Sequence, residues 1–178
     1  MKQINKYIVE RLHINKDIDS YNYHPKTNGE LQELVDKLIK ERGYNADLND
    51  IDTSEITNMY ALFYDSFFNG DISNWDVSNV ESMNSMFYKS KFTGKNGSIS
   101  NWDVSNVENF GYMFALSSFN GDISNWDVSN AKYMNSMFAQ SKFTGEHGDI
   151  SKWDVSKVIN MNFMFNGTPL EKNPPKWY

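Results

Sequence analysis

The chain of 178 residues contains no cysteine. Disulfides and thiolate-ligated metal sites are therefore excluded, and the redox state of the compartment has no bearing on folding. Basic residues are also in deficit, with 17 lysines and arginines against 23 aspartates and glutamates and a net charge of −6. Binding to nucleic acid requires a basic face, as does electrostatic docking on an anionic membrane. We expect no nucleic-acid partner.

Long apolar segments are absent too. Nothing approaches the roughly 20 apolar residues of a membrane span, so membrane insertion is not expected. Charged residues interrupt the first fifteen positions, which argues against a secretory signal; they are Lys2, Lys6, Glu10 and Arg11. On this evidence the localisation is left open, with a cytoplasmic or virion-associated protein favoured over a secreted one.

Catalytic motifs are scarce. The three histidines, His13, His24 and His147, show no metal-ligand spacing. The sequence has no Gly-x-Ser-x-Gly elbow, no phosphate-binding loop and no Gly-x-Gly-x-x-Gly motif. We therefore expect no enzyme, no catalytic residue, no cofactor and no metal site, and an enzyme acting on a glycan is only a distant alternative.

An internal repeat dominates the sequence. The string Trp-Asp-Val-Ser begins at Trp75, Trp102, Trp126 and Trp153, at spacings of 27, 24 and 27 residues. Continuing the alternation by 24 residues reaches Ile51 in one direction and Trp177 in the other. The repeat predicts five units and a truncated edge strand at 173–178; the units lie near 46–70, 71–97, 98–121, 122–148 and 149–172.

Two hydrophobic periods follow each other within a unit. Around Trp75 apolar and polar residues alternate, which is typical of a short strand, and from Val80 onward the apolar spacing of three and four predicts a helical turn. Ser78 and Glu81 have the spacing of a capping box. We predict an α/β repeat solenoid, a short leucine-rich-repeat-like stack of strand–helical-turn units.

Residues 1–45 are expected to form an N-terminal helical cap. The apolar stripe after Thr27 predicts a helix that ends near Arg42, with Thr27 and Glu30 at its start and Gly43 just beyond its last turn. An earlier helix is expected from Ile4 to Leu12. Between them, the segment from Asn15 to Lys26 is interpreted as a loop or one short strand.

The string from Gly70 to Val80, Gly-Asp-Ile-Ser-Asn-Trp-Asp-Val-Ser-Asn-Val, and its copies resemble the BspA-like leucine-rich repeats, a domain of unknown function found in surface proteins of mycoplasmas and gut bacteria. The resemblance covers roughly Ala46 to Tyr178. It implies a protein that binds host components or other cells. Related repeats also occur in bacteriophage genomes, so a phage-encoded member is a further expectation.

Outward-pointing positions of the stacked units form two columns of candidate binding residues. One column contains Asn74, Asn101, Asn125 and Lys152, and the other contains Asp76, Asp103, Asp127 and Asp154. The aspartates are interpreted either as an acidic stripe for a basic partner or for Ca²⁺, or as structural residues that hydrogen-bond to nearby N–H groups and serine hydroxyls. The repetition in every unit favours the structural interpretation.

The longer units carry additional residues at two places. Lys95 and Asn96, and 51 residues later Glu146 and His147, are expected to project from the same edge of the stack. We predict a non-catalytic protein-interaction module that binds a protein partner of unknown identity through the strand face and these two loops. The alternative is a structural or assembly component of a phage particle, with possible self-association.

Overall fold

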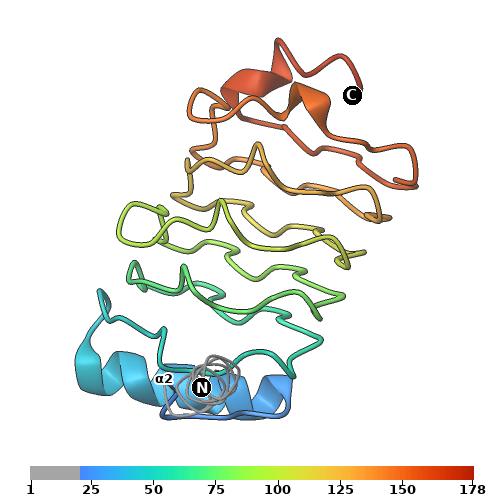
Figure 1. The fold of residues 1–178 in the computed structure, drawn as a ribbon. Helices are drawn as coiled ribbons and strands as arrows, with labels where there is room; N and C mark the ends of the chain where they lie inside the picture. Colours follow the sequence, from blue (N-terminus) through green and yellow to red (C-terminus); the bar gives the residue numbers. More distant parts are fainter. Residues whose placement is uncertain (1–20) are drawn as a thin grey trace, which may run out of the picture.

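The computed structural model describes residues 21–178, which stack in successive layers above the helix α2 (Asn28–Arg42) (Figure 1). We number the layers one to five after the sequence units that begin at residues 46, 71, 98, 122 and 149. The helix expected over Ile4 to Leu12 lies outside the described residues.

The helix α2 confirms the prediction made from its end residues. The Oγ1 atom of Thr27 accepts a hydrogen bond from the backbone N–H of Glu30, at 3.2 Å. At the other end Gly43 has a φ of 90°, and its N–H donates to the carbonyl of Ile39. The helix closes this end of the core with one buried stripe, formed by Leu31, Val35 and Leu38.

The prediction of an α/β solenoid built from strand–helical-turn units is wrong. Within residues 21–178 there is no strand longer than an isolated parallel bridge, and the only helices besides α2 are the short 3₁₀ helices η1 (Ile150–Lys152) and η2 (Pro169–Glu171). The expected edge strand at 173–178 is likewise irregular. The layers consist of turns.

The turn half of each layer, 82–90 in layer two, shows why no helix forms there. Every second N–H donates to the next layer: the donors Met83, Ser85, Phe87 and Lys89 meet the carbonyls of Asn109, Gly111, Met113 and Ala115 at 2.9 Å. The intervening N–H groups of Met86, Tyr88 and Ser90 donate to the carbonyl three residues earlier. The backbone N–H groups of the turn half therefore alternate between hydrogen bonds to the next layer and hydrogen bonds within their own turn.

Left-handed residues interrupt the turn half at intervals of four. Ser85 and Lys89 have φ values of 57° and 56° and occupy the third position of a turn, as in type II turns. A continuous helix cannot contain such residues. The apolar spacing of three and four arises instead because consecutive turns return side chains such as Met83 and Met86 to the core.

The Trp half of each layer, 71–80 in layer two, is bent where alternation predicted a strand. The N–H of Trp75 bonds to the carbonyl of Ile72, and that of Val80 bonds to Val77. Asp71 and Asp76 each accept from the N–H two residues further on, at 2.9 and 3.0 Å. These aspartate turns occupy N–H groups that a strand would use for hydrogen bonds to its neighbouring strand.

The core consists of aromatic columns that run along the stack. Phe87 lies 5.3 Å from Phe63 and 5.5 Å from Phe114 between ring centroids, with interplanar angles of 3°. Beside this column the indole Nε1 of Trp75 donates to the carbonyl of Leu48 in the layer before, at 2.9 Å. Trp177 repeats that contact with Ile150 at 2.9 Å, so the residue reached by extending the repeat continues the column.

Gln140, an exposed residue with a φ of 54°, offers a test of the turn geometry. Glycine at this position should raise the free energy of unfolding by about 0.5 kcal/mol, because relief of the left-handed strain exceeds the entropy that glycine adds to the unfolded chain. Valine should lower it by more than about 1 kcal/mol, since β-branched residues disfavour this conformation. Urea unfolding of both variants measures the difference, and equal effects would contradict the turn assignment.

Candidate functional site

The aspartate column lies on the outer surface and forms the predicted local hydrogen bonds. One carboxylate oxygen of each residue accepts from the serine N–H two positions later, at 3.0 to 3.1 Å; the four aspartates are Asp76, Asp103, Asp127 and Asp154. Among the described residues, the other oxygen of each has no hydrogen-bond donor. The serines interpreted as helix caps are therefore donors to aspartate turns, and the column still presents carboxylate oxygens outward.

At two of these turns, the stability of the fold depends on the charge of the aspartate. Hydrogen bonds from the side chain and the backbone N–H of Ser129 hold the pKa of Asp127 below its ordinary value, and Ser156 lowers the pKa of Asp154 in the same way. A lowered pKa in the folded chain means that the carboxylate form is the one that folding favours.

We therefore expect stability to fall in acid. The contribution of Asp127 and Asp154 should be complete above the ordinary carboxyl pKa of about 3.8 and should be lost as the pH drops through their lower folded values. Urea unfolding at a series of pH values between neutrality and acid measures this loss. The double substitution Asp127→Asn and Asp154→Asn keeps an acceptor without the titration, so its profile should be flatter; an unchanged slope would contradict the assignment.

The asparagine column points outward, as predicted, and its binding role stays a prediction. Asn74, Asn101, Asn125 and Lys152 are all exposed, and their side chains have no hydrogen bond within the described part. Residues that the sequence did not single out hold the layers together here. The side-chain amides of Asn79, Asn106 and Asn130 donate to serine carbonyls of the preceding layer, at 2.7 to 2.8 Å. Their repeated place directly after Trp-Asp-Val-Ser was the available signal.

The two longer loops line one cleft. Lys95 lies on one side, Glu146 and His147 lie on the other, and the shorter loop of the layer between them contributes Asn120 and Gly121. The cleft encloses about 470 Å³, and its remaining lining residues are Thr93, Gly94, Ser118 and Asp122. Asn96 is not part of the lining, because its amide turns back to the carbonyl of Asn69.

Each longer loop is fixed to the shorter loop before it. Thr144 donates its N–H and hydroxyl to Oδ1 of Asn120, at 2.8 and 3.1 Å, and Thr93 makes the same pair of bonds to Asn69. Gly148 lies so close to Asp122 that an added Cβ would be 1.9 Å from its carboxylate oxygen. The cleft walls are thus positioned by the stack.

The charged groups at the cleft are available for a ligand. His147 approaches Glu146 at 3.2 Å, but both side chains are more than half exposed, so this contact contributes little. Lys95 forms no ion pair with any residue in the described range. The cleft therefore offers one cationic wall and one wall with an acidic group and an imidazole.

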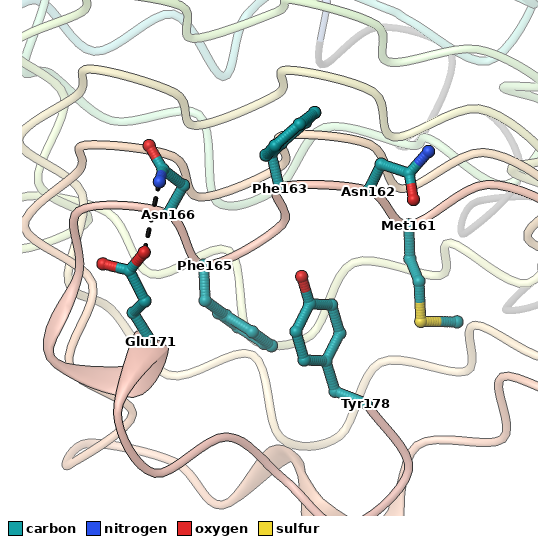
Figure 2. Close-up of a pocket in the computed structure, with 7 residues that line it drawn as sticks. All are labelled: Met161, Asn162, Phe163, Phe165, Asn166, Glu171 and Tyr178. Atoms are coloured by element: carbon teal, nitrogen blue, oxygen red, sulfur yellow. Dashed lines mark hydrogen bonds between the residues drawn. The ribbon is translucent and has the colours of Figure 1, made fainter.

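Exposed apolar side chains form further surfaces that sequence reasoning missed. On the turn halves they include Tyr60, Tyr64, Tyr112 and Leu116. At the C-terminal end of the stack, Ile159 is 70% exposed and Phe163 is 68% exposed. A second cleft, of about 380 Å³, opens beside Phe163 and Tyr178 (Figure 2).

Comparison with known families shows to which family the chain belongs. The family model described as "Mycoplasma protein of unknown function, DUF285" matches residues 2–115, 29–146 and 67–177, three overlapping stretches that together span almost the whole sequence. The chain belongs to the DUF285 family. The resemblance to a mycoplasma family of unknown function is thereby confirmed, whereas the BspA-like and phage-encoded assignments of this DUF285 chain remain predictions. Neither the curated proteins nor the solved structures gave a match.

The helices in the described part of this DUF285 chain do not reach membrane-spanning character. Between residues 21 and 178, none is both long enough and apolar enough to cross a bilayer.

Proposed function

We propose that this chain is a non-catalytic protein-interaction module of the BspA-like type, which binds a partner protein through its outer aspartate face and the cleft between the two longer loops. The cleft is the observation that carries the proposal. It brings together Lys95, Glu146 and His147, which belong to loops 51 residues apart in the sequence.

The chemistry of the cleft favours a polar partner segment. Its lining is composed of charged, hydroxyl and amide side chains with two glycines, so contacts would be hydrogen bonds and ion pairs. Lys95 suits an acidic group, and Glu146 suits a basic one. Because the shorter loops anchor both walls, little ordering would be required on binding, which preserves affinity.

Structural roles and candidate recognition roles belong to different residues, and this separation supports a binding role over a catalytic one. Most residues repeated in every layer are occupied in turns, interlayer hydrogen bonds and the core, and each repeated aspartate keeps only its second carboxylate oxygen for a partner. The residues that differ between layers are concentrated in the loops, where repeat proteins place recognition.

Charge reversal in the cleft tests the proposal. Peptides selected from a random display library on the wild-type chain should lose at least about tenfold in affinity for the double variant Lys95→Glu and Glu146→Lys, the loss typical of contacts that dominate an interface. Lys91→Glu, an exposed charge reversal outside the cleft, is the matched control and should leave affinity unchanged. If both variants bind the selected peptides as the wild type does, the cleft is not the recognition site.

A further inference from the structure

Three tyrosines form a row along the outside of the turn halves, across layers one to three. The rings of Tyr64 and Tyr88 stack on each other, with centroids 5.0 Å apart and an interplanar angle of 16°. Tyr88 in turn meets Tyr112 edge-on, at 6.5 Å and 70°. Tyr64 is 51% exposed and Tyr112 is 42% exposed, and none of the three rings belongs to the hydrophobic core. The row is therefore an aromatic surface that lies outside the core.

The repeat does not require tyrosines at these positions. Tyr64 and Tyr88 are equivalent residues of layers one and two, and the same position in the later layers holds Ala115, Ala139 and Asn166. Those layers form the same alternating backbone hydrogen bonds without the rings. Exposed aromatic residues that the scaffold does not need are typical of an interaction surface, where tyrosine is enriched.

Two opposite charges accompany the row in successive layers. Asp65 and Lys89 are equivalent left-handed turn residues, with φ values of 52° and 56°, and both are exposed. The N–H of Asp65 donates to the carbonyl of Tyr88 at 2.7 Å, and Nζ of Lys89 lies 5.6 Å from the centroid of the Tyr88 ring. Within residues 21–178 neither charge has an ion pair. We call the three tyrosines with these two charged residues the tyrosine face.

The order of the charges makes the tyrosine face complementary to itself. A half-turn about an axis that lies in the face, between layers one and two and across the stack, reverses the order of the layers. Asp65 then lies opposite Lys89 of a second copy, and Lys89 lies opposite Asp65 of that copy. The same rotation brings Tyr64 opposite Tyr88 of the second copy. One two-fold axis therefore pairs both charges and both stacked rings at once, as an isologous interface does.

We propose that the tyrosine face binds the same face of a second copy, so that the chain forms a two-fold symmetric homodimer. Charge complementarity favours this occupant. A basic partner surface would place a like charge against Lys89, and an acidic one would place a like charge against Asp65. The tyrosine face shares no residue with the loop cleft, so the proposal goes beyond the function proposed above.

Charge reversal of each residue separately, followed by mixing, tests the two-fold pairing. Sedimentation of the full chain over a concentration series should show a monomer–dimer equilibrium. Asp65→Lys and Lys89→Asp should each weaken the dimer at least about tenfold, because symmetry turns one substitution into two like-charge pairs. An equimolar mixture of the two variants should dimerise again, since both charge pairs of the mixed dimer then join opposite charges.

Gln140 supplies the matched controls, because it is the exposed, left-handed equivalent of both residues in layer four. Gln140→Lys and Gln140→Asp should dimerise as the wild type does, and thermal unfolding verifies that every variant retains the fold. Three results would overturn the proposal: a wild-type chain that stays monomeric at about 1 mM, where even a weak interface associates; single reversals that act like the controls; or a mixture that stays monomeric. The outcome is independent of the loop cleft, because Lys95→Glu should leave the dimer unchanged.

Discussion

Replacing Phe114 by alanine should lower the free energy of unfolding by about 3–5 kcal/mol, the usual range for a buried aromatic residue. Phe114 is fully buried at the middle of the stack. Its ring lies 5.5 Å from Phe87, 5.8 Å from Phe138 and 4.1 Å from Phe119. Alanine would remove contacts with three layers at once, and the surrounding turns are fixed by interlayer hydrogen bonds that oppose collapse of the cavity.

Denaturant unfolding followed by tryptophan fluorescence measures this loss. Phe163→Ala is the matched control, because Phe163 is exposed at the end of the stack and its truncation should change stability by less than about 0.5 kcal/mol. Similar losses for the two variants would show that Phe114 is not a central core residue.

Gly70→Ala should be comparably damaging, at about 3 kcal/mol or more, because overpacking against the backbone has little room for relief. An added Cβ at Gly70 would lie 2.0 Å from the carbonyl oxygen of Ala46, the same atom that accepts the N–H of Asp71. Accommodating the methyl group would separate layers one and two where the chain turns. The prediction is checked by urea unfolding.

Gly29→Ala is the control for that experiment. Gly29 lies in α2, and an added Cβ there would meet only the Thr27 hydroxyl, at 4.0 Å. Alanine favours helices over glycine by about 1 kcal/mol, so this substitution should leave stability unchanged or slightly raised. If Gly70→Ala were equally harmless, layers one and two would not be in contact as described.

The sequence predicted the features that depend on burial and on helix ends. The apolar stripe and end residues of α2 are local signals, and Thr27 and Gly43 perform the expected roles. The recurrence of Trp, Met and Phe likewise identified buried columns, because any stacked arrangement must bury those side chains.

The conformation of the turn halves could not be predicted from the same pattern. Consecutive turns and a short helix both return side chains to the core every three or four residues, so the spacing does not separate them. The left-handed positions would have done so, but they hold residues such as Lys89, Tyr112 and Leu116, which carry no left-handed preference. The serine after each aspartate was equally ambiguous, since helix caps and aspartate turns use the same residue types.

For the candidate site too, some features were visible in the sequence and others were not. The length of the loops at Lys95 and Glu146 was visible in the sequence and led to the cleft. The interlayer hydrogen bonds of Asn79, Asn106 and Asn130 were not visible, because the sequence does not show which carbonyls of the neighbouring layer lie beside these amides.

The alternating hydrogen bonds of the turn halves hold together the layers that position the loop cleft, and they can be detected directly. Scalar couplings across hydrogen bonds in a labelled sample should connect the amide nitrogen of Ser85 with the carbonyl carbon of Gly111, and that of Phe87 with Met113. A coupling from Ser85 to the carbonyl four residues earlier, the partner in an α-helix, would contradict the layered turn structure.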